Sequence, residues 1–214
     1  MFQLFSVSYK QLITGRSEEL FMLRKKTFSD RLNWDVKCLN NMEIDEFDGD
    51  DTQYILGVYR QQIICSTRLI PLDKPNMITH TFSAQFGDVP LPGNLIESSR
   101  FFVDKSLCKQ LLGDAYPVSY CLYLALINYG IANHLDSLYT IVSKSMLAIL
   151  RRTGWRIRIV KEAYLTPKEP IYLLHVPTDK ASQAIMAPKA GRTLEIEPQA
   201  LLKWPLTLPV SHKI

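Results

Sequence analysis

The segment IESSRFFVD, residues 96–104, carries a glutamate and an arginine inside an otherwise apolar and aromatic run. Isoleucine, valine and two phenylalanines predict a strand over Leu95–Val103. Successive side chains of a strand point to opposite faces, which predicts one face with Glu97, Ser99 and Phe101 and another with Ser98, Arg100 and Phe102. A charged pair inside a central strand is costly unless it is partnered or used. The segment is therefore a candidate site, unless it is an exposed edge strand.

Helices and strands are predicted on both sides of this segment. Upstream, a helix over about 15–29 precedes two strands, Gln53–Tyr59 and Ile63–Ile70. Downstream we expect helices at Lys105–Leu112, Val118–His134 and Lys144–Thr153, and strands at Leu138–Ser143, Arg156–Val160 and Ile171–Val176. Helices between strands predict one α/β domain over 1–214, with three layers (α-β-α) and a mixed sheet. The C-terminal tail, about 178–214, is expected to be irregular.

Composition narrows the classes of function. With 214 residues, 47% apolar and 21% charged, the chain suits a folded globular domain. A net charge of +4 is too mild to predict a nucleic-acid partner. The first ten residues lack the apolar run of a secretory signal, and no uncharged stretch is apolar enough to predict a membrane span. Four cysteines without CxxC spacing and histidines without HExxH spacing predict a cytoplasmic protein with no metal site.

Two further segments could carry chemistry. The run EIDEFDGDD, residues 43–51, has six carboxylates in nine positions and could hold a cation or form a solvated turn. It lies within an irregular stretch, Asn33–Thr52, whose length is typical of functional or mobile loops. In LRKKTFSDRLNW, residues 23–34, Arg24 and Phe28 share one helix face and Trp34 follows. This segment is either an aromatic lid over a ligand or a basic helix face with core aromatics.

Together these segments resemble the acyl-homoserine-lactone synthases, the LuxI-type autoinducer synthases, and in particular their plant-associated enterobacterial branch. The resemblance rests on a set of residues in order and spacing: Arg24, Phe28 and Trp34, then Asp45 and Asp48, then Arg68, then Glu97 and Arg100. The strings RKKTFSDRL, DEFDG, PNMITHTF, ESSRFFVDK, YTIVS and WPLTLPV are also similar. It covers about residues 1–177.

The resemblance implies an acetyltransferase-like (GNAT-like) fold and two substrates. These are S-adenosylmethionine, which is consumed and so is not a cofactor, and an acyl thioester on acyl carrier protein. The products are acyl-homoserine lactone and 5′-methylthioadenosine. The RxxGxG/A phosphate cradle of general acetyltransferases is missing from 100–113, which makes coenzyme A a less favoured donor. No cofactor is implied, and the oligomeric state stays open, with a monomer compatible.

The resemblance also implies roles for the residues. Glu97, with Ser99 and Arg100 beside it, is the catalytic segment, and Glu97 is the expected base, acting through water. The S-adenosylmethionine site takes Arg24, Phe28, Trp34, Asp45, Asp48, Arg68 and Phe101. The first five of these lie in an N-terminal portion, about 1–52, that is expected to be mobile. The arginines could hold the substrate carboxylate or tie the acidic loop to the core. By strand alternation, Arg100 is expected to point away from Glu97 and to anchor that loop.

Two more surfaces complete the expectation. The acyl pocket is assigned to Ser99, Leu122, Thr140, Val142, Met146 and Leu150, with Phe101 beside them. A threonine at position 140 accompanies 3-oxo chains in this family, so a short 3-oxo chain of six to eight carbons is expected. Acidic carrier protein is expected to dock on a basic cluster made of Arg151, Arg152, Arg156, Arg158 and Lys161, with the alternative that these are ordinary surface residues.

Two other functions remain open from the residues. An acetyltransferase-like enzyme that takes acyl-coenzyme A would act without carrier protein and release no methylthioadenosine. A binding module that uses the acidic loop to recruit a basic partner would keep its function when Glu97 is replaced by alanine.

Overall fold

The computed structural model describes residues 1–210, and its core is an eight-stranded mixed sheet. The strand order is β10-β1-β4-β5-β6-β7-β9-β8. The strands are β1 (Phe2–Ser8), β4 (Gln53–Tyr59), β5 (Gln62–Pro71), β6 (Ile96–Val103), β7 (Ser137–Ser143), β8 (Arg158–Tyr164), β9 (Pro170–Pro177) and β10 (Leu206–Leu208). A two-stranded hairpin, β2 (Cys38–Leu39) and β3 (Met42–Glu43), stands apart. Residues 96–103 of the candidate segment therefore form a central strand, β6, and not an edge strand.

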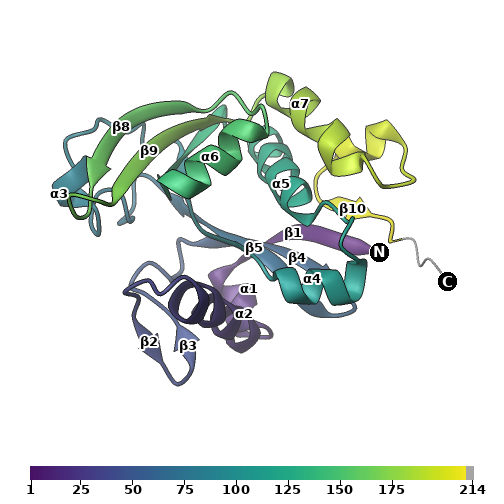
Figure 1. The fold of residues 1–214 in the computed structure, drawn as a ribbon, viewed down its shortest axis with the longest axis horizontal. Helices are drawn as coiled ribbons and strands as arrows, with labels where there is room; N and C mark the ends of the chain where they lie inside the picture. The colour runs from purple at the N-terminus through teal and green to yellow at the C-terminus, as the bar shows by residue number, and fades with distance from the viewer. Residues whose placement is uncertain (211–214) are drawn as a thin grey trace.

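Helices cover both faces of this sheet (Figure 1). One face carries α5 (Val118–Ala132), α6 (Lys144–Arg152) and α7 (Lys180–Gly191), which share the largest apolar core. The other carries α1 (Tyr9–Ile13), α2 (Ser17–Lys25) and a π-helix, η1 (Lys26–Arg31), around a second core. Shorter helices are α3 (Ser83–Phe86), α4 (Lys105–Leu112) and the 3-10 turn η2 (Pro198–Leu202). This is the expected three-layer arrangement.

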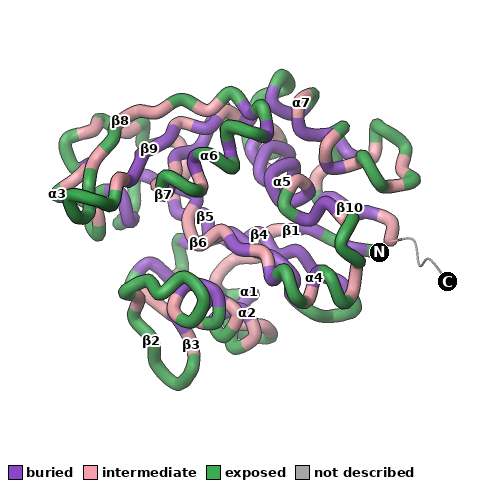
Figure 2. The backbone as a smooth tube through the Cα atoms, in the orientation of Figure 1, coloured by how far each residue is buried: buried purple, intermediate pink, exposed green. Residues whose placement is uncertain are grey.

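The helix α5 is central because it is apolar on every side. Ten of its residues are buried, among them Cys121, Leu122 and Leu124. A helix that is apolar all round belongs in a core. Figure 2 shows this helix and the central strands as the buried part of the molecule, while β2 and the turn after it are exposed. No helix within residues 1–210 is long and apolar enough to cross a membrane.

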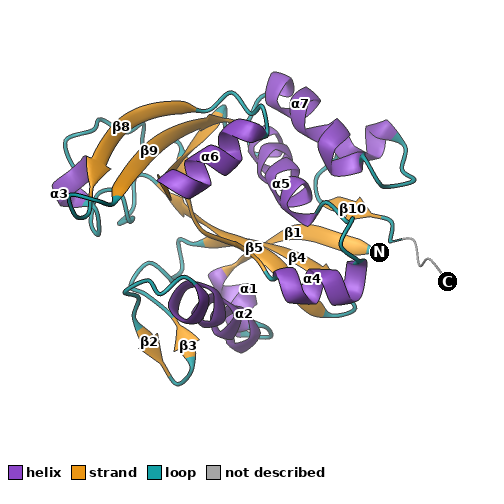
Figure 3. Ribbon diagram, in the orientation of Figure 1, coloured by secondary structure: helices purple, strands orange, loops and turns teal. Residues whose placement is uncertain are grey.

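Two neighbouring strands separate at the point where the candidate glutamate lies. The parallel pair β6 and β7 is joined only at Ile96–Leu138 and Glu97–Tyr139, although both strands run several residues further. Figure 3 shows the sheet dividing there into two wings. Beyond Glu97, the edge of β6 that faces β7 has no strand partner among residues 1–210.

Three predictions of secondary structure are wrong, and one strand was missed. The helix over 15–29 is two elements, because a π-helix replaces the α-helix from Lys26. The strand expected at 156–160 begins at Arg158 and runs to Tyr164. The strand β1 was not predicted, although its alternating Phe2 and Leu4 are fully buried. The tail is not irregular over 180–208, since it contains α7, η2 and β10; residues 211–214 lie outside the described part.

The C-terminal helix α7 forms for identifiable reasons. The Asp179 carboxylate caps it by accepting from the Ser182 amide at 2.7 Å. Met186 and Ala190 are fully buried in the core that α5 dominates. Pro188 within the helix explains why the sequence did not predict it, because proline disfavours helix interiors.

Candidate active site

Glu97 is a buried carboxylate with one unpaired oxygen. It is 1% exposed, and its Oε2 accepts the Ile78 amide at 3.0 Å. Among the described residues its Oε1 has no hydrogen-bond partner. Burial raises the pKa of Glu97, against smaller opposing effects from the Arg68 charge and the Ile78 amide. Such a group can accept a proton more readily than an ordinary carboxylate.

A β-bulge turns Arg100 onto the same side as Ser99. The register of β5 and β6 shifts between Ser66 and Arg68, and Arg100 has φ +52°. One residue of β5 thus faces two residues of β6, which interrupts strict alternation. Arg68 Nε donates to Ser99 Oγ at 3.2 Å, and Arg68 and Arg100 both contact the Asp45 carboxylate. The prediction that Arg100 points away from Glu97 and Ser99 is therefore wrong, while its predicted anchoring of the acidic loop is confirmed.

The same bulge places Phe101 on the opposite face. Its ring stacks on Tyr123 of α5, with centroids 5.0 Å apart. Phe102 instead packs edge-to-face on Phe28 at 6.3 Å. Phe101 is thus separated by the sheet from the other residues predicted to bind S-adenosylmethionine. It lies on the α5 face, which is the face predicted for the acyl chain.

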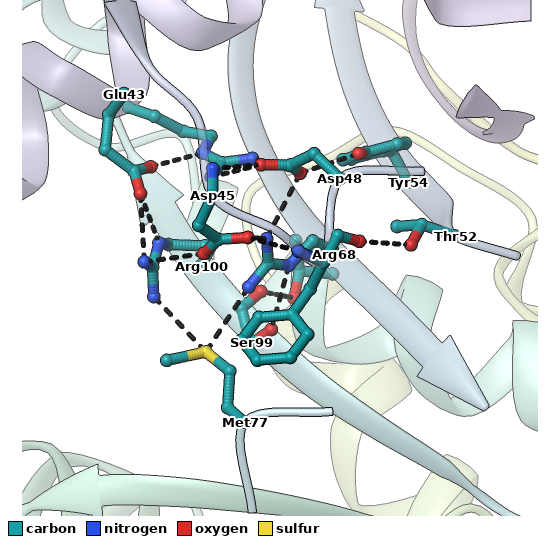
Figure 4. A network of polar contacts seen from close by, with 12 residues as sticks. Glu43, Asp45, Asp48, Thr52, Tyr54, Arg68, Met77, Ser99 and Arg100 are labelled. Carbon is teal, nitrogen blue, oxygen red and sulfur yellow. Dashed lines mark hydrogen bonds and ion pairs between the residues drawn. The ribbon is translucent and has the colours of Figure 1, made fainter. Parts of the chain in front are cut away.

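The acidic loop is tied to the sheet by a network of buried ion pairs (Figure 4). Arg24 donates to Glu43 at 2.6 Å and to both oxygens of Asp48 at 2.7 and 2.9 Å. Arg68 pairs with Asp45 at 2.5 Å and with Asp48 at 3.1 Å. Arg100 Nη2 contacts Glu43 and Asp45, each at 2.9 Å. Three guanidinium groups therefore balance three carboxylates, and the pairing favours the alternative in which the arginines hold the loop.

The pKa values in this network follow from the pairing. Burial alone would raise the pKa of Asp48, but Arg24 and Arg68 hold it well below its usual range. Burial alone would also raise the pKa of Glu43, which Arg24 and Arg100 likewise lower. Burial would lower the pKa of Arg24, yet Asp48 and Glu43 raise it. Asp48, Glu43 and Arg24 are therefore all charged at neutral pH. The pKa of Glu97, in contrast, is shifted toward the neutral form.

Two aromatic side chains stack beside the network. Phe28 is fully buried and lies under the exposed ring of Trp34, with centroids 5.1 Å apart. Trp34 is 48% exposed, so its outer face is accessible. The Arg100 guanidinium lies 5.6 Å from the Phe28 ring centre. The pair thus joins the charged network to the surface, as expected of a lid residue on a buried support.

The residues predicted for the acyl chain gather on the α5 face of the separated strands. Leu122, Val142 and Leu150 are buried in the largest core, and Met146 packs against it. Thr140 is half-buried on β7, where alternation places it on the same face as Val142. Ser99 is the exception, because it contacts Arg68 on the other face.

The predicted docking residues form a surface cluster at the end of α6 and the start of β8. Arg151, Arg152, Arg156 and Arg158 are exposed. Lys161 is half-buried and pairs with Asp88 at 2.5 Å, so its charge is partly neutralised. Arg156 precedes β8, so it lies outside the strand that carries Arg158.

Comparison with known proteins assigns the family. Residues 8–186 match the family described as autoinducer synthase. An acyl-homoserine-lactone synthase from Yersinia ruckeri is 55% identical over 211 residues, which cover 98% of each chain. One from Pantoea stewartii subsp. stewartii is 53% identical over 210 residues, covering 98% of this chain and 100% of the relative. The chain belongs to the autoinducer synthase family.

This autoinducer synthase is an acyltransferase, an acyl-homoserine-lactone synthase that makes quorum-sensing signals. Solved structures match its fold. A CoA-dependent acyl-homoserine lactone synthase, BjaI, with SAM and isopentyl-CoA, has TM-score 0.78 at 18% identity, covering 89% of this chain and 90% of that one. An acyl-CoA N-acyltransferase from Pseudomonas aeruginosa has TM-score 0.57 at 15% identity, covering 82% and 99%. The predicted acetyltransferase-like fold is confirmed.

Three residues of the synthase's network were not predicted. Glu43 joins Arg24 to Arg100, Tyr54 donates to Asp48 at 2.7 Å, and Met77 accepts from two arginines. Glu43 stands in the acidic run that the sequence singled out, so that signal was available. Tyr54 alternates within a predicted strand and Met77 lies in a proline-rich connection, and neither pattern distinguishes them from core residues.

Proposed function

We propose that this synthase makes a short-chain 3-oxo-acyl-homoserine lactone from S-adenosylmethionine and an acyl thioester on acyl carrier protein. The observation that carries the proposal is the buried Glu97 carboxylate, with one free oxygen, at the point where β6 and β7 separate. A carboxylate with a raised pKa next to an unpaired strand edge suits proton removal from an amine that attacks a thioester.

The first bond to form is the amide. Glu97, through water, takes a proton from the substrate's α-ammonium group, and the amine nitrogen attacks the thioester carbonyl. The carbon–sulfur bond of the thioester then breaks, and the carrier protein's thiolate leaves and takes up a proton. Peptide groups along the open edge of β6 offer donors to the negative oxygen of the intermediate.

The second bond closes the lactone. A carboxylate oxygen of the substrate attacks its own γ-carbon, and the bond from that carbon to the sulfonium sulfur breaks. Methylthioadenosine leaves with the electron pair, so no external base is needed. The protein contributes by holding the chain folded, which makes the closure effectively intramolecular.

The sulfonium substrate is proposed to bind at an aromatic surface and not at the acidic residues of the network. Glu43, Asp45 and Asp48 are all paired with arginines, so they have little charge left for a cation. The accessible face of Trp34 offers a cation–π surface instead, next to the network. The structure of BjaI with SAM and isopentyl-CoA supports a sulfonium substrate in this fold.

Carrier protein is proposed over coenzyme A on two grounds. The phosphate-cradle pattern is absent from residues 100–113, and four exposed arginines near the end of α6 suit an acidic protein. A cytoplasmic location is part of this proposal and agrees with free thiols at Cys65, Cys108 and Cys121.

Mass spectrometry of culture extracts tests the proposal. A host that expresses the chain and has no synthase of its own should release a 3-oxo lactone of six to eight carbons. A different chain length or an unsubstituted C3 would correct the substrate assignment. Acylation of another amine, without methylthioadenosine, would overturn the proposal.

A further inference from the structure

Met77 lies against two arginines of the network and next in the chain to the residue that binds Glu97. Its sulfur accepts from Arg68 Nη2 and from Arg100 Nη1, each at 3.3 Å. The amide of the next residue, Ile78, donates to the Glu97 carboxylate at 3.0 Å. The residue is 9% exposed and packs with Phe47 and Ile70. Met77 thus lies where the chain passes from the two guanidinium groups to the carboxylate.

The contact with sulfur is unusual for an arginine. A thioether is a weak acceptor, whereas a carboxylate binds a guanidinium strongly. Arg68 lies near enough to Glu97 for its charge to act on that group. Even so, no ion pair joins Glu97 to an arginine within the part of the chain that the structure describes, while Arg68 and Arg100 pair with Glu43, Asp45 and Asp48. One edge of each of these two guanidinium groups therefore contacts the uncharged Met77 sulfur instead of a carboxylate.

The segment that presents Met77 is held firmly. Asn76 is fully buried, and its side-chain nitrogen, Nδ2, donates to the backbone carbonyl of Lys74 at 2.8 Å. Its side-chain oxygen accepts the Thr79 amide at 3.0 Å. These bonds fix the backbone of the turn at 76–79, which presents the Met77 side chain to the two arginines.

We propose that Met77 is a positioning residue, an uncharged spacer that prevents Arg68 and Arg100 from forming an ion pair with Glu97. An arginine that reached Glu97 would stabilise the carboxylate and weaken it as a base. The spacer leaves the arginines on the acidic loop and leaves Oε1 of Glu97 free for substrate. This role rests on the proposed function of Glu97 as the base.

Other charged and titratable groups around Glu97 do not replace this role. Asp45, from the loop before β4, is already bound to both arginines. Tyr139 on β7 is the register partner of Glu97, and its ring contacts His175 of β9, with centroids 5.5 Å apart. His80, in the same connection as Met77, packs on Phe47. Arg68 and Arg100 are thus the cations that the spacer must control.

The test is a direct titration of Glu97 by carbon-13 NMR in enzyme labelled at the glutamate carboxyl carbons. Glu97→Gln assigns the signal by removing it. Met77→Leu keeps the spacer and should leave the titration midpoint unchanged. Met77→Ala removes it and should lower the midpoint by about one pH unit or more, because an adjacent arginine favours the charged form. The exposed Met22→Ala is the matched control and should change nothing.

Turnover supplies the second measurement. Met77→Ala should lower kcat about tenfold while the KM for S-adenosylmethionine changes less than about twofold, since a weaker base slows only the chemical step. If Met77→Ala does not fold, Met77→Val gives the same test with a smaller cavity. Unchanged midpoints in these shortened variants would overturn the spacer. Full activity of Glu97→Gln would instead reject the proposed base, and the titration would still decide the role of Met77.

Discussion

The Glu97 carboxylate and the carboxylates of the acidic loop have different partners. The loop's carboxylates each meet a guanidinium group, whereas Glu97 accepts the Ile78 amide and has one oxygen with no hydrogen-bond partner within residues 1–210. The unpaired state costs stability, because burial disfavours charge. A group kept in that state is more useful for proton transfer than for holding the fold.

Glu97→Gln should therefore reduce kcat by about 10²–10⁴-fold, the range for loss of a general base, and should stabilise the fold. The raised pKa of Glu97 in the folded state gives relative stability that is present below its ordinary value of 4.5 and is lost as pH rises through the raised value. The gain in Tm of Glu97→Gln over wild type should thus be small at pH 4 and grow toward pH 8. Glu195→Gln, on the surface, should show no such trend.

Asp48→Asn should have the opposite effect on stability. It removes one partner from Arg24, Arg68 and Tyr54, and breaking a buried pair costs about 3–5 kcal/mol. The lowered pKa of Asp48 gives stability that is present above its ordinary value of 3.8 and is lost as pH falls through the lowered value. Urea unfolding at pH 7 measures the loss, with the exposed Glu46→Gln as control. Equal stability of the two variants at pH 7 would contradict the network's structural role.

The bulge in β6 could not be predicted from the sequence. The strand itself, its central position and its charged pair were predictable from residue types. The face of each side chain was not, because one residue at positive φ shifts everything after it. Arg100 is not a residue type that signals a bulge, so strict alternation assigned it and Phe101 to the wrong faces.

The strand β7 sets the expected specificity for the acyl chain. Thr140 lies beyond the last residue paired with β6, on the α5 face with Val142. Its hydroxyl can donate to a C3 carbonyl of a chain in that position. Thr140→Val should lower the ratio of 3-oxo to unsubstituted product about threefold to tenfold, the value of one hydrogen bond. Competition between the two thioesters measures the ratio, with Thr166→Val in the exposed β8–β9 turn as control; an unchanged ratio would remove Thr140 from specificity.

Across the molecule, the predicted three-layer architecture and mixed sheet are confirmed, and most strands lie within a residue or two of the expected bounds. The additions include β1 and β10, which extend the sheet at one edge, and α7, which covers α5. Their sequence signals were weak because they are short or contain proline. The separation of β6 from β7 could not be predicted either, since it depends on how the two wings of the sheet pack on α5 and α6.

Arg151 and Arg152, at the end of α6, are exposed and are the proposed contact for acyl carrier protein. Arg151→Glu combined with Arg152→Glu should raise the KM for acyl carrier protein about tenfold at low salt, with less effect as salt screens the charge. The KM for S-adenosylmethionine should not change. Lys10→Glu with Lys203→Glu makes the same charge change elsewhere on the surface and serves as control. An equal rise for both substrates, or in the control, would argue against docking at this cluster.

The proposed reaction is tested most directly by product stoichiometry with purified protein, S-adenosylmethionine and 3-oxohexanoyl-acyl carrier protein. Lactone and 5′-methylthioadenosine should form in equal amounts, this donor should be clearly preferred over the coenzyme A thioester, and Glu97→Gln should lose both products. Lactone formation that persists at full rate in Glu97→Gln, or methylthioadenosine released without lactone, would contradict the proposed reaction.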